Sequence, residues 1–313
     1  MFDNLKPILK TPSVVDELSG KFFYKKSAKN LSWFKVGGVL EYLYIPKNEA
    51  DLSILLNELI PNIEINVFGK LSNILIRDGG LSGLSILIPA DFKKLIHKEE
   101  NILNVGSGAL DKQVAKKSID LQIGGFEFLS GIPGTIGGGI FMNAGCYGSE
   151  FKDIVLDVNF LNRNGKKIKK KAEEIDFKYR ESNIPKDLII TSVNLIGFKK
   201  NKEEIKRKIS EISKKRISTQ PQGYPTGGST FKNDKQYKAW ELDNKIFISD
   251  LRMGVEGAYV FNFEVGLRKL SGIEIGSFQK LERRPRLNQV GQVWRRIFDP
   301  TIAITERSQP LTN

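Results

Sequence analysis

The stretch SGIPGTIGGGIFMNAGCYGSE, residues 130–150, is the most unusual part of this sequence. Seven of the eighteen residues from Gly131 to Gly148 are glycine, and charged residues are absent from that span. Glycine loses more backbone entropy on folding than other residues and buries no side chain, so such a cluster requires a physical reason. Pro133-Gly134 and Gly137-Gly138-Gly139 predict a segment that is neither regular helix nor regular strand across its length.

Two explanations fit this glycine-rich segment. A long, uncharged run of bare backbone suits close contact with a large flat or phosphorylated ligand, and tight packing between domains is the alternative. The segment is not a P-loop, because no Gly-Lys-Ser/Thr follows it. It also lacks the context of the dinucleotide-binding fingerprint, which follows a strand and opens a helix. The residues alone therefore predict a ligand contact without identifying the ligand.

The composition is that of a packed globular protein. The chain has 313 residues, of which 40% are hydrophobic and 10% aromatic, and this length predicts two or three domains. The single cysteine, Cys146, excludes an internal disulfide and a multi-cysteine metal site, so no metal is expected. No apolar run approaches the roughly 20 residues that a membrane span needs, and the N-terminus lacks the apolar core of a signal peptide. We therefore expect a cytoplasmic protein that does not bind membranes.

The net charge of +13 raises the alternative of nucleic-acid binding. However, the lysines concentrate in KKIKKKAEE (166–174) and KEEIKRKISEISKK (202–215), where acidic residues interrupt them. Such runs are more often solvated faces than binding sites, and net charge also attracts phosphorylated small molecules. We expect no nucleic-acid partner, because that alternative explains the charge and nothing else.

Local patterns predict an α+β fold. Leucines at helical spacing predict a helix over 48–59 with Asn48 as its cap. We interpret 91–101 as a charged break in which His97 is a surface residue, and 164–165 as a turn between strands. Further helices are predicted over 13–18, from Leu110 to Leu121 and over 202–218, and strands over 41–46, 65–69, 73–77, 84–89, 102–108, 154–171 and 188–198.

Two further stretches suggest anion binding. In VFGKLSNILIRDGG (67–80), a strand ends at Gly69, and the loop carrying Ser72 and Asn73 can form a nest of backbone N–H groups. A plain β-turn is the alternative. In IDFKYRESNI (175–184), Arg180 is one of only six arginines before residue 260, against 34 lysines. An arginine in such a lysine-rich region suggests a need for its two-pronged binding of carboxylate or phosphate, although a surface ion pair remains possible.

The stretch TQPQGYPTGGSTFKN (219–233) presents Ser229 after an irregular loop. A serine nucleophile normally needs an adjacent base, usually histidine. The only histidine is His97, so acyl transfer by a Ser-His pair is poorly supported. A serine that donates a proton to a carbanion-like intermediate remains open.

Taken in order, SWFKVGG, SNILIRDGG, EFLSGIPGTIGGGIFMNAGCYG, FKYRES and GGSTFKN resemble the motifs of the UDP-N-acetylenolpyruvoylglucosamine reductase family over roughly residues 20–258. The resemblance implies an FAD-binding part of the vanillyl-alcohol-oxidase (PCMH) type, made of two subdomains at 1–92 and 93–203. It also implies a smaller α+β substrate-binding domain at 204–313. The implied reaction is an NADPH-dependent reduction of UDP-N-acetylglucosamine enolpyruvate to UDP-N-acetylmuramate, with FAD as cofactor, by an enzyme expected to be a monomer.

The resemblance also assigns roles to residues. Arg180 would stabilise negative charge that develops toward the substrate carboxylate, and Ser229 would protonate the neighbouring carbon. Substrate contacts are expected from Tyr179, Arg216, Lys232 and Asn233. The FAD contacts implied by the two glycine-containing loops are Gly69, Lys70, Leu71, Ser72, Asn73, Ile132, Pro133, Gly134, Thr135, Gly138, Gly139, Asn143 and Gly145.

The sequence departs from the family pattern in three places. Leu71 stands where a second loop glycine is usual, and Gly139 where alanine is common. After EGAYV (256–260), the family's Ser-x-x-His-x-Asn-Phe segment and its catalytic glutamate cannot be aligned. At the same point the Lys:Arg ratio changes from 34:6 to 2:7, which suggests a shifted reading frame or a replaced terminus. A flavin-binding protein without turnover and another flavin oxidase therefore remain alternatives.

Overall fold

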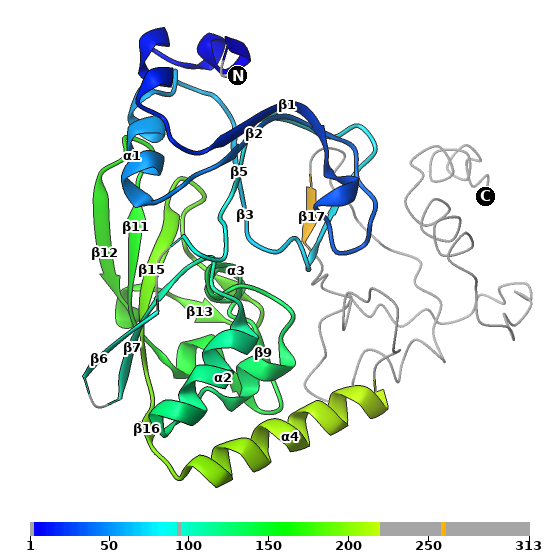
Figure 1. The fold of residues 1–313 in the computed structure, drawn as a ribbon, viewed down its shortest axis with the longest axis vertical. Coiled ribbons are helices and arrows are strands. Elements are labelled where there is room, and N and C mark those ends of the chain that lie inside the picture. The colour runs from blue at the N-terminus through cyan, green and yellow to red at the C-terminus, as the bar shows by residue number, and fades with distance from the viewer. Residues whose placement is uncertain (1–2, 93–94, 100, 220–257, 261–313) are drawn as a thin grey trace, which may run out of the picture. The chain divides into compact units, whose positions relative to one another are not determined.

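The computed structural model describes residues 3–92, 95–99, 101–219 and 258–260 (Figure 1). Its first sheet has four strands in the order β1-β2-β5-β3. Both β2 and β3 run parallel to β5, whereas β1 is antiparallel to β2. The bounds are β1 Lys21–Ser27, β2 Val39–Ile45, β3 Ile65–Phe68 and β5 Leu81–Leu87. Helix α1 (Glu49–Glu58) connects β2 to β3, so the helix predicted over 48–59 and the strands predicted over 41–46 and 65–69 form one strand–helix–strand unit.

The start of α1 follows from its sequence. The side chain of Asn48 accepts a hydrogen bond from the Asp51 N–H at 2.9 Å, as predicted for the cap. Leu52, Leu55 and Leu56 are buried in one of the hydrophobic clusters of the protein. The helix predicted over 13–18 is instead a short 3-10 helix, Pro12–Asp16, in which Val14 and Val15 are buried. β-Branched residues such as this pair slightly lower the propensity for a longer α-helix. Another 3-10 turn covers Asp3–Ile8, and a third Ala28–Asn30.

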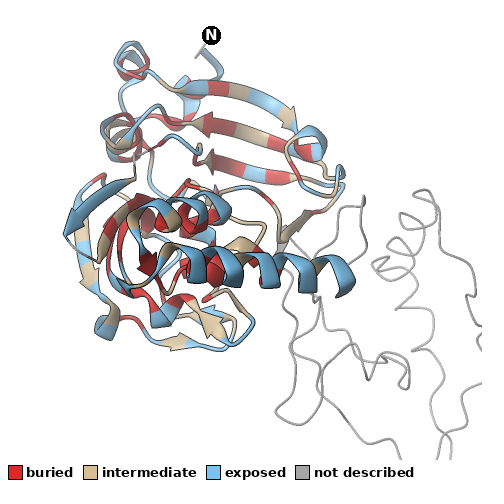
Figure 2. Cartoon of the chain, turned by 60° about the horizontal axis from the view of Figure 1, so that its bottom comes forward, coloured by how far each residue is buried: buried red, intermediate tan, exposed pale blue. Residues whose placement is uncertain are grey.

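The second sheet is antiparallel, with the order β12-β11-β15-β7-β6. Gly165, with φ at 70°, forms the predicted turn between β11 and β12. One face of the sheet packs against α2 (Asp111–Leu121) and α3 (Ile136–Phe141), and the buried side chains between them form a second hydrophobic cluster (Figure 2). The bounds are β6 Ile96–Glu99, β7 Ile102–Gly106, β11 Val155–Leu161, β12 Lys167–Lys171 and β15 Ile189–Ile196.

Two further sequence interpretations were wrong. The charged break at 91–101 contains strand β6, which pairs with β7 although all four of its residues are exposed. An exposed edge strand needs only backbone hydrogen bonds, so no apolar alternation marks it. The segment Gly137–Gly139 is helical, within α3. Its flanking residues Ile136 and Ile140 are fully buried, and their packing outweighs the low helix propensity of glycine.

Short elements complete the described chain. Helix α4 (Lys202–Thr219) contacts α2 and buries Ile205 and Ile212, while most of its other residues are exposed (Figure 2). Two-stranded pairs are β4 (Ile74–Ile76) with β17 (Ala258–Val260), β8 (Ile123–Gly124) with β16 (Phe198–Lys199), β9 (Gly145–Cys146) with β10 (Ser149–Glu150), and β13 (Phe177–Lys178) with β14 (Glu181–Ser182). The remaining 3-10 turns are Glu127–Gly131, Phe151–Asp153 and Ala172–Glu174.

The cores follow the chain in two groups. Side chains between Leu5 and Phe92 form two hydrophobic clusters, and those between Leu103 and Leu195 form a third. Leu161 and Ile189, at the ends of β11 and β15, pack into the first group and so join the two halves. The predicted division of the chain into two FAD-binding subdomains, at 1–92 and 93–203, and a substrate-binding domain, at 204–313, stays a prediction.

Candidate active site

The two predicted cofactor loops meet at Gly69 and Thr135. Gly69 follows β3, and Thr135 precedes α3. A Cβ atom placed on Gly69 would overlap the Thr135 hydroxyl, so only glycine permits this approach. Segments 66 residues apart in the sequence are therefore adjacent in the fold.

The loop after Gly69 folds around Leu71. This residue has φ at 50°, in the left-handed region, and its side chain is buried in the first group of cores. Its carbonyl accepts a hydrogen bond from the Trp33 N–H at 3.2 Å. Lys70 is exposed, and Ser72 and Asn73 are half-buried. The loop thus turns its apolar residue inward and leaves its polar residues accessible.

The protein itself explains several glycines of the 131–148 segment. A Cβ atom on Gly137 would lie 2.8 Å from the Ser107 Cβ, and one on Gly139 would overlap the ring of Phe151. The Gly137 N–H donates to the Ser107 carbonyl at 2.8 Å. Tight packing, the alternative weighed from the sequence, is therefore a sufficient reason at these positions. Gly138 differs, because it is exposed and the nearest atom to its Cβ position is the Thr135 hydroxyl oxygen at 3.5 Å.

Asp111 lies against the same segment at Gly134, and it was not among the residues predicted from the sequence. It begins α2 and is fully buried, and neither of its carboxylate oxygens has a hydrogen-bond partner among the described residues. Burial raises the pKa of Asp111 well above its ordinary value, which the backbone of Gly134 partly opposes. An acidic residue in a first helical turn is ordinary, so the sequence carried no signal of this burial.

Asn143 joins the glycine-rich segment to the Arg180 hairpin. It is fully buried, and its side-chain nitrogen donates to Glu150 and to the Lys178 carbonyl, each at 2.9 Å. Its side-chain oxygen accepts from the Lys152 N–H at 3.0 Å. Because both polar atoms of the Asn143 side chain form hydrogen bonds within the protein, a contact with the cofactor would have to come from the backbone of Asn143. That contact stays a prediction.

Arg180 is presented by a tight turn between β13 and β14. Its φ is 60°, in the left-handed region, at the second residue of the two-residue loop, where a turn that needs a positive φ usually has glycine or asparagine. The guanidinium donates to the Gly145 carbonyl at 2.5 Å and to the Asn143 carbonyl at 3.5 Å, and it lies over the Tyr179 ring, 4.8 Å from the centroid. Backbone carbonyls, which carry no full charge, hold this cation. Its positive charge is therefore available to a carboxylate or phosphate.

A second arginine approaches the same region from α4. Arg216 donates to the Gly131 carbonyl. Burial raises the pKa of the Cys146 thiol to about 11, and the positive charges of Arg180 and Arg216 lower it from what burial alone would give. Both guanidinium groups therefore lie near enough to Cys146 to lower the pKa of its thiol.

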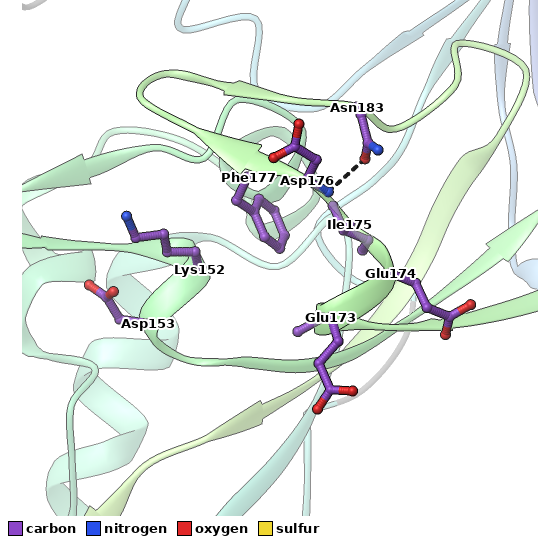
Figure 3. Close-up of a pocket in the computed structure, with 9 residues that line it drawn as sticks. Lys152, Asp153, Glu173, Glu174, Ile175, Asp176, Phe177 and Asn183 are labelled. Carbon is purple, nitrogen blue, oxygen red and sulfur yellow. Dashed lines mark hydrogen bonds between the residues drawn. The ribbon is translucent and has the colours of Figure 1, made fainter.

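A recess of about 670 Å³ lies elsewhere, and Figure 3 shows the residues that line it. It is lined by the β13 region and the turn at 172–174, where the Asp176 N–H donates to the Asn183 side chain at 2.9 Å. Four carboxylates, those of Asp153, Glu173, Glu174 and Asp176, outnumber its single cation, Lys152. This charge disfavours an anionic dinucleotide, and the recess contains none of the predicted site residues.

The other predicted residues divide into two groups. Ile132, Pro133 and Gly134 are half-buried beside the loop that contains Ser72. Ser229, Lys232 and Asn233 lie outside the described residues.

Within the described ranges, no cluster of three or more metal-ligating side chains occurs. None of the helices in that part of the chain has both the length and the hydrophobicity to cross a membrane.

Comparison with known proteins identifies relatives. Residues 40–169 match the family model described as FAD binding domain. The UDP-N-acetylenolpyruvoylglucosamine reductase of Orientia tsutsugamushi (strain Ikeda) is 44% identical over 244 residues, which cover 76% of this chain and 80% of that protein. The Rickettsia rickettsii (strain Sheila Smith) protein of the same name is 46% identical over 233 residues, covering 74% and 79%. The crystal structure of the Thermus caldophilus reductase matches with a TM-score of 0.64 at 25% identity, covering 90% of this chain and 96% of that one.

Proposed function

Because this chain belongs to the UDP-N-acetylenolpyruvoylglucosamine reductase family, we propose that it reduces UDP-N-acetylglucosamine enolpyruvate to UDP-N-acetylmuramate. It is an α+β, FAD-dependent oxidoreductase. NADPH is the proposed electron donor, and the product serves peptidoglycan precursor synthesis. The proposed location is the cytoplasm, and the proposed oligomeric state is a monomer.

The arrangement around Arg180 is the observation that most supports this proposal. The guanidinium lies at Gly145, at one end of the glycine-rich segment, while Thr135 of the same segment meets the Gly69 loop. A substrate bound beside the cofactor would therefore find a cation whose hydrogen-bond partners, among the described residues, are neutral carbonyls. Arg180 then stabilises the negative charge that develops toward the substrate carboxylate during reduction.

The described residues fit the cofactor. Gly69 and Thr135 bring two loops into contact, the backbone at Gly138 is bare and exposed, and Lys70 supplies a positive charge near an anionic diphosphate. When bound, FAD supplies the hydride chemistry, and the protein supplies position and electrostatics. The proposed FAD contacts are those that the family resemblance implies in the loops at 69–73 and 132–145.

The remaining roles are assigned by family resemblance. Ser229 donates the proton to the carbon next to the reduced one, which makes a catalytic histidine unnecessary. Arg216 and Lys232 contribute positive charge toward the substrate diphosphate, and Tyr179 and Asn233 contribute further contacts. The two FAD-binding subdomains and the substrate-binding domain from 204 onward belong to the same proposal.

One alternative has support of its own. The change in basic residues at 260, from 34:6 to 2:7 in Lys:Arg, coincides with the loss of the family's C-terminal motifs. This favours, as the second candidate, a flavin-binding protein of the same fold without turnover. The rival of another flavin oxidase gives no reason for Arg180 and Ser229 together.

A visible spectrum of the purified full chain, recorded without oxygen, tests the proposal. Flavin absorbance that bleaches with NADPH and recovers on addition of the enolpyruvyl sugar nucleotide would support the reductase. Bleaching without recovery would favour the binding protein without turnover. A colourless protein that takes up no added FAD would contradict both.

A further inference from the structure

Asp111 is a buried acidic residue in the first turn of α2. Its exposed fraction is 0%, and both carboxylate oxygens lack hydrogen-bond partners within the described ranges. A buried polar group of this kind costs stability, so its presence calls for an explanation. Asp51, in the first turn of α1, gives the contrast. It is also buried, but it accepts hydrogen bonds from the Ser19 N–H, the Lys47 N–H and the Tyr44 hydroxyl.

The carboxyl group of Asp111 points at Gly134. A Cβ atom on Gly134 would lie 2.8 Å from the Asp111 Oδ2 and 3.9 Å from the Ser72 hydroxyl oxygen. The Asp111 N–H donates to the Gly134 carbonyl at 3.3 Å. Asp111 therefore holds Gly134 through its backbone and occupies the space that a side chain at Gly134 would need. Ser72, from the other cofactor loop, lies within reach of the same point.

A neutral carboxyl is the form that suits this place. Burial raises the pKa of Asp111 well above its ordinary value. Asp111 also acts on Cys146, whose thiol is neutral below a pKa of about 11. An ionised carboxylate next to a bound diphosphate would repel it, whereas a protonated carboxyl would not.

We propose that Asp111 is a positioning residue for the cofactor: its side chain packs against Gly134, so that the turn at 132–135 and Ser72 present a fixed surface to the FAD diphosphate. This inference rests on the proposed function, because it requires FAD at the two loops. It assigns to Asp111 a role through Gly134 and no contact with the substrate. It also explains why position 134 is glycine.

The test is a fluorescence titration of FAD into the flavin-free full chain, beside a denaturant titration of the same samples. Asp111→Ala removes the support and is expected to weaken FAD binding roughly tenfold with little change in stability. The free energy of unfolding changes little because two effects oppose each other: the variant no longer buries a carboxyl group without a hydrogen-bond partner, which is stabilising, but it leaves a small cavity, which is destabilising. Asp51→Ala is the matched control, expected to lower stability while folded protein keeps wild-type FAD affinity.

Two further variants separate this role from a merely structural one. Asp111→Asn keeps shape and neutrality, so FAD affinity should stay within about twofold of wild type; a tenfold loss there would overturn the neutral role. Gly134→Ala should weaken FAD binding, and less so when combined with Asp111→Ala, because the space is then free. If the effects of Gly134→Ala and Asp111→Ala on FAD affinity are additive, the contact between Asp111 and Gly134 does not explain the loss of affinity.

The outcomes for the inference and the proposed function are distinguishable. A wild-type chain that binds no FAD would overturn both. A wild type that binds FAD, beside an Asp111→Ala variant that binds it equally well, would overturn the inference alone.

Discussion

Arg180 donates a hydrogen bond from its guanidinium to the Gly145 carbonyl, at 2.5 Å, and so connects the hairpin β13–β14 to the end of the glycine-rich segment. Asn143 strengthens the same connection, since its side chain donates to the Lys178 carbonyl at 2.9 Å. The cation is thus held in place by backbone groups, without a carboxylate among the hydrogen-bond partners that the described residues give it.

Arg180→Lys is expected to keep the fold and the bound flavin but to lose most of the turnover. An ammonium group is a compact point charge and cannot form the two-pronged contact that the guanidinium makes with a carboxylate. Steady-state reduction of the enolpyruvyl sugar nucleotide, with the flavin spectrum as a measure of cofactor content, checks this. Wild-type turnover in the variant would remove Arg180 from the mechanism.

Ser229→Ala is expected to separate the two half-reactions. If Ser229 donates the proton to the substrate, reduction of the flavin by NADPH does not need it, whereas reoxidation by the sugar nucleotide does. Anaerobic stopped-flow spectra record each half separately. Equal slowing of both would contradict the assigned role.

Much of the fold could be predicted, because its signals are local. The helix α1 shows leucines at helical spacing and a capping asparagine, and both features act within the helix itself. Strand β6 and helix α3 were missed for the opposite reason. The exposed residues of β6 carry no alternation, and α3 depends on buried Ile136 and Ile140, which pack against distant parts of the chain.

The candidate site was predictable only at the level of motifs. The sequence indicated that loops at 69–73 and 132–145 belong to one site, and they do meet at Gly69 and Thr135. It could not distinguish Gly139, which packs against Phe151, from Gly138, which is exposed. Nor could it identify Asp111, since burial depends on how α2 lies against the glycine-rich segment.

Cys146 is expected to react slowly with alkylating agents at neutral pH. Burial raises its pKa to about 11, and its thiol donates to the Phe128 carbonyl at 3.2 Å. The thiolate is the reactive form, so the rate should rise about tenfold per pH unit from 7 to 10 without levelling off. The same chain in denaturant, where its single cysteine is free, should level off near pH 8.5, the ordinary thiol value.

The Arg216→Met variant extends the thiol experiment. The charge of Arg216 lowers the pKa of Cys146, so its removal should raise that pKa and slow alkylation at any given pH. An alkylation rate that levels off near pH 8.5 in the folded wild type would contradict the burial of the thiol. A faster reaction in the variant, with the fold retained, would show that access and not charge controls the rate.

Leu71 combines a buried side chain with a backbone conformation that favours glycine. Its φ of 50° is strained for any residue with a Cβ atom, while its side chain is only 3% exposed. Truncation to alanine is expected to cost about 2–5 kcal/mol of unfolding free energy, because packing is lost and the strain is kept. Leu71→Gly loses the same packing but relieves the strain. We therefore expect the glycine variant to be more stable than the alanine variant by about 1 kcal/mol.

Leu55, fully buried in α1, is the matched control for Leu71. There the backbone is helical, so Leu55→Ala should be more stable than Leu55→Gly by about 1 kcal/mol, the reverse order. Denaturant titrations of the four variants without added FAD measure both differences. If alanine is the more stable replacement at both positions, the left-handed backbone at Leu71 stores no strain, and the departure from a glycine in this loop carries no energetic consequence.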